Sequence, residues 1–463
     1  MEENTVTPSA EADDKSNFAK GSIPRTILRL ALPMTMAQFI SVAYSMVDRI
    51  YLGRLAGAQH LALTGVGITL PIILIVTSFA YLCGMGGGPL FAISRGKGND
   101  QEAERIMGNS FTLLLIFGIV LTVTVITLRK PILFLFGASE DTYPFAGDYL
   151  MFYTMGTIFN LVKIGMNPFI NAQGFGKFGM MTIALGALIN IVLDPIFIFA
   201  LGMGARGAGL ATTIAQFCSA VWVMRFLTGK KVVLRLKLSC MKLQAKRVRS
   251  ILTLGMSGFF MTMTTSFAQI VCNVTLQRYG GDLYVGAMAV VNSLREVMFA
   301  PMQGISGGAS PVLGFNYGAG MLDRVRRGIR FSALLIVGLS SLMWLVLMIA
   351  PSTLIRAFNT NPELIRAGIP AIRIYFSMFI FMSMQLASQP VFVALGMPKH
   401  SIFFAFLRKA FIAVPLTLLL PMWGMGTNGV FIAEAASQLL GGLACFSTMY
   451  FVVYRKLKTK AEN

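Results

Sequence analysis

The sequence is poor in charge. Only 13% of its 463 residues are Asp, Glu, Lys or Arg, whereas 55% are apolar, and soluble domains carry roughly 25% charged residues. The 39 basic residues outnumber the 19 acidic ones, which gives a net charge of +20. This composition excludes a soluble globular enzyme, a disordered chain and a nucleic-acid-binding protein. It predicts an integral membrane protein whose Lys and Arg mark loops that face anionic lipid.

Residues that ligate metals are also scarce. The two histidines, His60 and His400, lie far apart, and the five cysteines form no C-x-x-C pair. We therefore expect no His-based metal centre and no disulfide framework, and interpret the cysteines as small hydrophobic side chains. The glycine-rich segment 84–88 lacks the Lys-Ser or Lys-Thr ending of a phosphate-binding loop. No cofactor is expected, and ATP is not expected to be the direct energy source.

Long apolar runs fill most of the chain. Because a membrane-spanning helix needs about 20 apolar residues, these runs predict an all-α membrane protein with twelve transmembrane helices, and their strength is unlike that of a β-barrel. The expected spans are 26–52, 62–90, 108–130, 147–168, 178–202, 206–228, 250–277, 285–314, 329–351, 370–395, 401–423 and 428–454.

The two halves of the chain share a pattern. Pro168-x3-Ala172-x-Gly174-x2-Lys177 recurs as Pro390-x3-Ala394-x-Gly396-x2-Lys399, at an offset of 222 residues. Because six spans is an even number, both halves enter the membrane in the same sense, so we predict a parallel internal repeat of two six-helix lobes. The predicted parts are a cytoplasmic tail (1–25), an N-terminal lobe (26–228), a basic linker (229–249), a C-terminal lobe (250–454) and a second cytoplasmic tail (455–463).

The distribution of positive charge predicts the orientation. Most of the 39 Lys and Arg fall on the side of the two termini, which places both termini in the cytoplasm. The linker 229–249 holds eight of them and no acidic residue, and is expected to be a solvated loop near anionic headgroups. The first 25 residues have no apolar segment and are expected to form a solvated tail, not a cleaved signal. We expect a multi-pass protein of the bacterial plasma membrane.

A few polar residues fall deep inside predicted spans. Asp48 and Asp194 are both expected in the outer half of the membrane, where a carboxylate is costly and indicates function. Asn190 lies one helical turn before Asp194, and Thr212 and Asn160 fall at compatible depths. Two carboxylates with amide and hydroxyl oxygens suit Na⁺ or a shared proton.

Structural roles for these residues stay open. Asp48 could cap its helix or pair with Arg49 or Arg54, and Asp194 could satisfy the helix break at Pro195. Asn190 and Thr212 could be interhelical hydrogen-bonding residues.

Several motifs together resemble one transporter family. They are Ala31-Leu32-Pro33, Val47-Asp48-Arg49-Ile50-Tyr51-Leu52-Gly53, Asn190-x3-Asp194-Pro195, Arg295, Gly304, Pro311 and Asn316-Tyr317-Gly318-Ala319-Gly320. Over about residues 22–456 the chain resembles the multidrug and toxic compound extrusion (MATE) family of cation-coupled antiporters. The resemblance implies a V-shaped pair of lobes around a central cavity. It also implies export of amphipathic, often cationic, compounds driven by inward H⁺ or Na⁺.

The resemblance is to the DinF-type branch of that family. Asp48, Asn190, Asp194 and Thr212 match the branch's cation-site pattern, with Na⁺ as one possible occupant. The acidic residues that the NorM-type branch keeps in spans seven and ten are missing: 250–277 is uncharged, and span ten offers only Gln385 and Gln389. Coupling is therefore expected in the first lobe alone.

Substrate contacts are expected from flexible thioethers, aromatic rings and charged groups, which accommodate varied ligands. The candidates are Met34, Tyr44, Met256, Met288, Arg295, Glu296 and Glu434. For the methionines the alternative is ordinary packing, and for Glu296 it is a buried ion pair with Lys163 or Arg225.

These observations predict a secondary antiporter and not an enzyme. Its expected partners are small amphipathic compounds and the lipid bilayer, with no nucleic acid, and it is expected to be a monomer. One alternative is a flippase of an amphipathic lipid or lipid-linked precursor, with Arg49, Lys163 and Arg295 along a lateral groove. The other is a membrane scaffold or receptor that transports nothing. The sequence leaves the substrate, and the choice between H⁺ and Na⁺, open.

Overall fold

The computed structural model describes residues 18–53, 59–356 and 361–457. Residues 1–17 and 458–463 of the two predicted tails lie outside the described residues, as do Arg54 and the side chains of Arg49 and His60.

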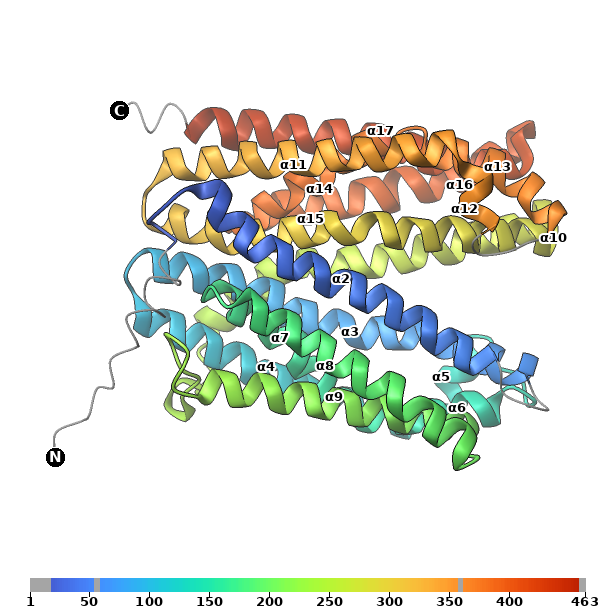
Figure 1. Cartoon of the computed structure of the whole chain (residues 1–463), viewed down its shortest axis with the longest axis horizontal. Coiled ribbons are helices and arrows are strands. Elements are labelled where there is room, and N and C mark those ends of the chain that lie inside the picture. Colours follow the sequence, from blue (N-terminus) through green and yellow to red (C-terminus); the bar gives the residue numbers. More distant parts are fainter. Residues whose placement is uncertain (1–17, 54–58, 357–360, 458–463) are drawn as a thin grey trace. The chain divides into compact units, whose positions relative to one another are not determined.

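The described chain is helical and contains no β-strand (Figure 1). Within the described residues, eight helices are long and apolar enough to cross a membrane, or nine if the bent pair α13 and α14 forms one span. The prediction of an all-α membrane protein is confirmed. The helices of the first half are α2 (Ile23–Gly53), α3 (Gln59–Gly96), α4 (Asp100–Thr127), α5 (Arg129–Leu135), α6 (Tyr143–Met155), α7 (Thr157–Ala172), α8 (Gly176–Pro195), η1 (Ile196–Ala200) and α9 (Gly204–Thr228).

The second half begins after a short turn of 3₁₀-helix, η2 (Leu238–Cys240). Helix α10 (Ala245–Gly318) is interrupted at Gly281, whose φ of 64° is not helical, and the chain turns back there (Figure 1). The remaining elements are α11 (Leu322–Ile349), α12 (Pro351–Arg356), α13 (Pro362–Phe376), α14 (Phe379–Ala394), α15 (Pro398–Phe406), η3 (Leu407–Ala413), α16 (Val414–Leu420), η4 (Pro421–Met425), α17 (Gly426–Thr448) and η5 (Met449–Tyr454).

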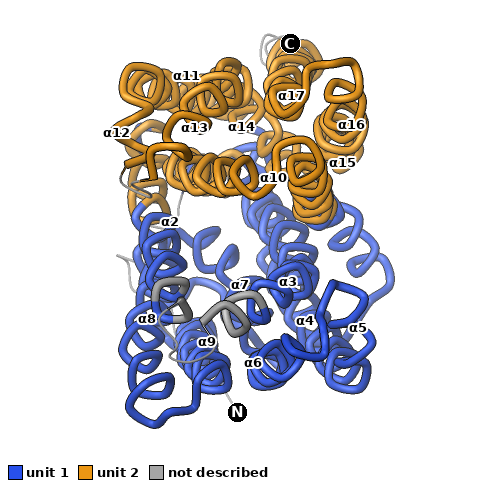
Figure 2. The backbone as a smooth tube through the Cα atoms, turned by 90° about the vertical axis from the view of Figure 1, so that its right-hand side faces the viewer, with its two compact units in different colours: residues 1–22, 36–259, 314–320 blue, residues 23–35, 260–313, 321–463 orange. Residues whose placement is uncertain are grey.

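The chain divides into two compact units, which Figure 2 colours separately. Unit 1 comprises residues 1–22, 36–259 and 314–320, and unit 2 comprises 23–35, 260–313 and 321–463. The first part of α2 thus belongs to unit 2. Its backbone packs closely on α10, because a Cβ atom at Gly304 or Gly308 would collide with Thr35 or Ala31.

The backbone repeats at the offset found in the sequence. Glycines with positive φ, which end or connect helices where a side chain would be strained, occur in pairs 222 residues apart. The pairs are Gly98 and Gly320, Gly174 and Gly396, Gly202 and Gly424, and Gly204 and Gly426. The same turns therefore follow corresponding helices in both halves of the chain.

The basic linker packs on unit 1. Val232, Leu234 and Leu236 are buried there, because alternate residues of this extended segment are apolar. The Asn109 side chain donates to the carbonyl oxygens of Cys240 and Lys242. This differs from the expected solvated loop, although Lys230, Lys231 and Lys237 are exposed.

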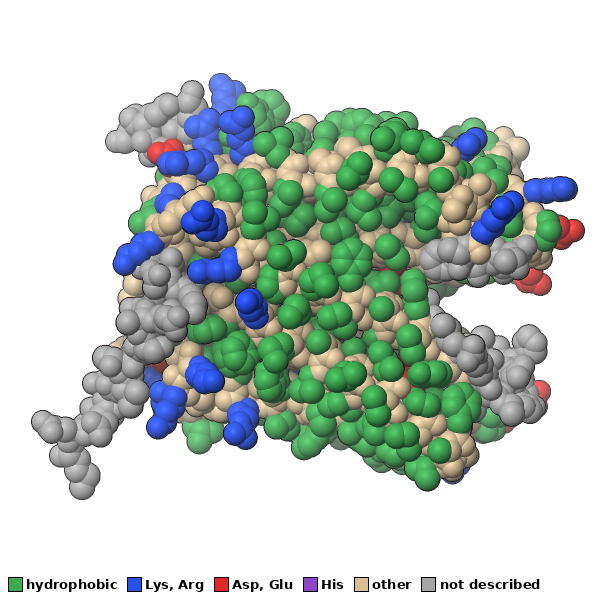
Figure 3. All heavy atoms as spheres, viewed as in Figure 1, with side chains coloured by type: hydrophobic (Ala, Val, Ile, Leu, Met, Phe, Trp, Pro, Cys, Tyr) green, Lys and Arg blue, Asp and Glu red, His purple; other side chains and the backbone are tan. Residues whose placement is uncertain are grey.

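The surface is largely apolar. Figure 3 shows hydrophobic side chains spread over the face in view, while Lys and Arg gather mainly near one end of the helices. This is the pattern expected of helices that cross a bilayer and whose basic loops face anionic lipid.

Candidate functional site

The candidate site of unit 1 is built on α8 and α9. Asn190 and Asp194 lie one turn apart on α8, so their side chains share a face, and both are buried, at 1% and 0% exposure. Pro195 ends α8, and the chain continues as the π-helical turn η1. Such turns often mark functional sites.

One amide joins the two helices. Asn190 Nδ2 donates to Asp194 Oδ1 at 3.2 Å and to Thr212 Oγ1 on α9 at 3.3 Å. Thr212 in turn donates to the Ala208 carbonyl at 2.9 Å. The three predicted residues therefore form one connected group.

Asp48 and Tyr44 of α2 complete this group. The Asp194 carboxyl lies against that of Asp48, and Tyr44 lies beside Thr212 and both carboxyls. Tyr44 was expected among the substrate contacts, whereas the structure places it against the candidate coupling residues.

Asn160 belongs to an adjacent polar layer. It is buried, and its Nδ2 donates to the Tyr153 hydroxyl at 3.3 Å and to Thr77 Oγ1 at 3.5 Å. Gln216 of α9 contacts the same tyrosine hydroxyl. This layer extends the polar interior of unit 1 without a direct hydrogen bond from Asn160 to Asp194 in the described structure.

Small residues let the helices approach closely enough to form the site. A Cβ atom at Gly186 of α8 would lie 2.5 Å from Ser219 Oγ of α9. Close approach of backbones at small residues is typical of helix packing in membranes. The polar side chains one and two turns further along α8 are thereby held against α9.

Two buried oxygen atoms of the site have lone pairs available to bind a cation or a proton. Asp194 Oδ2 and Asn190 Oδ1 are buried, and apart from the Asp48 carboxyl beside Asp194 no described group is placed to share a proton with them. Because carboxylate, amide and hydroxyl oxygens are the ligands that hard cations prefer, this group can bind Na⁺. It can equally take up a proton, since two adjacent buried carboxylates do not easily ionise together. Among the described residues, no three His, Cys, Asp or Glu side chains cluster as a metal site.

The predicted methionine contacts lie in different environments. Met288 is only 2% exposed, whereas Met34 and Met256 are half-buried. Met34 packs on Gly307 of α10, where a Cβ atom would lie 2.5 Å from its Cε atom.

In unit 2, the charged candidates adjoin two residues that sequence reasoning missed. Glu434, expected to face a cavity, is 2% exposed and accepts a hydrogen bond from Lys409 at 2.6 Å. Arg295 donates to the Tyr375 hydroxyl at 3.4 Å, and Arg408 lies near Glu434 and Arg295. Glu296 is half-buried and has no ion pair in the described structure.

Arg408 and Lys409 were not predicted as site residues, because they lie near the start of the predicted span 401–423. The signal that could have found them is the adjacent pair of basic residues in an otherwise uncharged helix. The π-helical turn η3 (Leu407–Ala413) contains both.

Comparison with known proteins identifies the family. The MatE family model matches residues 33–196 and 258–419, most of the chain. This chain therefore belongs to the MatE family, whose members are transporters and not enzymes.

Named relatives match nearly end to end. "Multidrug export protein MepA" of Staphylococcus haemolyticus is 23% identical over 439 residues, covering 94% of each chain. "FAD transporter" of Shewanella oneidensis is 23% identical over 454 residues, covering 94% of this chain and 96% of that protein.

Solved structures share the fold. An outward-facing multidrug resistance MATE family transporter of the MOP superfamily superposes with a TM-score of 0.89 at 19% identity, covering 97% of this chain and 99% of the other. A MATE crystal structure in the bent conformation gives a TM-score of 0.89 at 20% identity, covering 96% and 99%. The chain is thus a multi-pass membrane transporter with the MATE fold.

Proposed function

We propose that this protein is a secondary active antiporter that exports amphipathic, often cationic, compounds in exchange for inward H⁺ or Na⁺. Its curated relatives include multidrug export proteins, which supports the class of substrate. The proposed setting is the bacterial plasma membrane, with a monomer whose termini are both cytoplasmic.

The observation that carries the proposal is the buried group on α2, α8 and α9. Asp194 Oδ2 and Asn190 Oδ1 have no N–H or hydroxyl donor among the described residues, and the Asp48 carboxyl lies against that of Asp194. In a membrane interior such oxygens are costly unless an ion or a proton occupies the site. This is the chemistry that cation coupling needs, and it is the pattern attributed to the DinF-type branch.

A coupling cycle follows from this chemistry. When a cation or proton enters, its positive charge offsets the negative charge of the Asp48–Asp194 pair and lowers the repulsion between α2 and α8. Helix α2 contains Pro33, and proline weakens a helix at the preceding turn. We propose that α2 changes its bend with the occupancy of the site and so ties release of the compound to uptake of the cation.

The proposal is tested by ethidium efflux from proteoliposomes under an imposed pH or Na⁺ gradient. We expect efflux that depends on one of the two imposed gradients, and the gradient that drives it identifies the coupling ion. If the protein ignored both gradients and moved labelled lipid between leaflets instead, the flippase alternative would replace antiport.

A further inference from the structure

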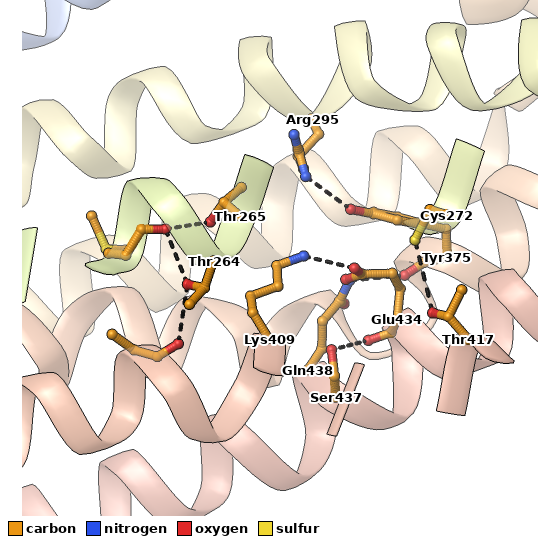
Figure 4. A network of polar contacts seen from close by, with 12 residues as sticks. Thr264, Thr265, Cys272, Arg295, Tyr375, Lys409, Thr417, Glu434, Ser437 and Gln438 are labelled. Carbon is orange, nitrogen blue, oxygen red and sulfur yellow. Dashed lines mark hydrogen bonds and ion pairs between the residues drawn. The ribbon is translucent and has the colours of Figure 1, made fainter. Parts of the chain in front are cut away.

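Unit 2 contains a polar cluster that corresponds to the site of unit 1. The 222-residue offset relates Tyr153 to Tyr375, Thr212 to Glu434 and Gln216 to Gln438. In unit 2 the three residues again lie together: Gln438 Nε2 donates to the Tyr375 carbonyl at 3.1 Å, and the charge of Glu434 acts on Tyr375. Figure 4 shows this cluster. The two units therefore hold polar groups at the same place in the repeat.

The charges at these two places are opposite. Asp48 and Asp194 of unit 1 correspond to Ile270 and Leu416, which cannot ionise. Conversely, three basic residues of unit 2 replace uncharged residues of unit 1. They are Arg295 for Ile73, Arg408 for Gly186 and Lys409 for Ala187.

Only one of the three basic groups has a carboxylate partner. Lys409 and Glu434 form a buried ion pair at 2.6 Å, with side chains 5% and 2% exposed. Among the described residues, no carboxylate lies within 4 Å of the Arg295 or Arg408 guanidinium. Glu296 follows Arg295 in the chain, but consecutive residues point about 100° apart around a helix.

The two arginine side chains are half-buried and make few hydrogen bonds within the described structure. Arg408 Nε is buried and has no hydrogen-bond partner in the described structure. Arg295 makes one long bond, to the Tyr375 hydroxyl. Cations inside a membrane protein are costly without a counter-charge. The nearby Glu434 carboxylate is bound by Lys409, so it offsets only part of the charge of the three basic groups, and an anion from outside the chain would offset the rest.

We propose that Arg295 and Arg408 form an anion-binding subsite in unit 2, which receives the carboxylate or phosphate of an amphipathic transported compound. Guanidinium groups bind these anions through paired, charge-assisted hydrogen bonds. Lys409 neutralises Glu434, which would otherwise repel the anion. The inference rests on the proposed export function and adds acidic compounds to its substrates.

A half-buried aromatic ring, that of Phe299, lies beside the subsite. The Arg295 guanidinium is 5.9 Å from the Phe299 ring centre, and Phe299 stacks on Phe379 at 6.0 Å. Aromatic rings provide a broad apolar contact. A ligand with an acidic group and an apolar body therefore finds both partners within unit 2.

The test uses three probes with the same fluorescent body. Dansylglycine carries a carboxylate, dansylethanolamine is neutral and dansylethylenediamine carries an ammonium group. Binding to the purified full-length protein in detergent is measured by dansyl fluorescence, which needs no ion gradient. We expect dansylglycine to bind at least tenfold more tightly than the neutral probe.

Substitutions of the two arginines test whether they cause the tighter binding of dansylglycine. Arg295→Gln and Arg408→Gln should each lower dansylglycine affinity about tenfold while leaving the neutral probe within twofold. Arg295→Lys, which keeps the charge, should retain part of the preference. Arg366→Gln, an exposed position of α13, is the matched control and should change nothing.

The outcomes separate the inference from the export function. Equal binding of the three probes, or a preference for dansylglycine that survives both Gln variants, would overturn the subsite even if ethidium export is gradient-driven. Conversely, charge-selective binding without gradient-driven export would uphold the subsite and refute antiport. Displacement of dansylglycine by phosphatidylglycerol but not by phosphatidylcholine would identify a lipid headgroup as the source of the acidic group.

Discussion

The Lys409–Glu434 pair gives the sharpest stability prediction. Both side chains are almost fully buried, and Glu434 Oε2 has no hydrogen-bond partner among the described groups. Glu434→Gln leaves the Lys409 ammonium buried without a counter-charge, and Lys409→Met does the same to the carboxylate. Removing one partner of a buried pair costs about 3–5 kcal/mol. The shift per kcal/mol falls with chain size, from about 2–4 °C for domains of about 150–250 residues, so each variant of this longer chain should unfold several degrees below the wild type.

The double variant Lys409→Met/Glu434→Gln should behave differently. Replacing both partners removes the buried charges together, which is often neutral or stabilising, so its Tm is expected within a few degrees of the wild type. Thermal unfolding of the four detergent-purified proteins, followed by tryptophan fluorescence, measures this cycle. Asp148→Asn, which breaks the exposed pair with Arg206, is the control and should leave Tm unchanged. If the double variant lost as much stability as both single variants combined, the two charges would not be coupled and this reasoning would fail.

Three further variants probe unit 1. Gly255→Ala should destabilise the protein by about 1–3 kcal/mol, because the added Cβ atom would collide with the Leu82 backbone. The control is Gly338→Ala in unit 2, where the added Cβ atom meets open space. In thermal unfolding this control should be neutral or slightly stabilising. Asn190→Ala removes the amide that donates to both Asp194 and Thr212. Gradient-driven ethidium efflux should therefore fall at least tenfold, while Tm changes by only a few degrees. Unchanged efflux would exclude Asn190 from coupling. Arg247→Gln breaks a bidentate ion pair with Glu102 at 2.7 Å. The variant should lose at most about 1 kcal/mol of unfolding free energy, and this loss should shrink at high salt. A loss of stability that does not depend on salt would contradict this electrostatic role.

The fold class could be predicted because a bilayer imposes it. Apolar runs of about 20 residues have few alternatives to helices there, and the repeated Pro-Gly-Lys pattern marks turns that the structure confirms at Gly174 and Gly396. The division of α2 between the units could not be predicted. It depends on close backbone contacts at Gly304 and Gly308, which are formed between segments distant in the sequence.

The grouping of residues around Asp194 could be predicted from the sequence, because residue spacing along a helix determines which side chains share one face of it. Asn190 and Asp194 share a face by their four-residue separation, and Thr212 meets them because α9 follows α8 directly. The partner of Glu434 was not accessible, because Lys409 lies near the predicted end of its span. Its side chain reaches Glu434 on the neighbouring helix α17. The π-helical turn η3 contains Lys409 and the turn η4 precedes α17, and such turns shift the register that straight helices would give.

The central claim is that Asp48 and Asp194 couple export to an inward cation. Its most direct test is ethidium efflux from proteoliposomes under the driving gradient, comparing Asp48→Asn and Asp194→Asn with the exposed control Asp141→Asn. The account predicts loss of gradient-driven efflux in both site variants, with unchanged ethidium binding to the purified proteins and normal efflux in the control. Gradient-driven efflux that persists at the wild-type rate in both site variants would contradict it.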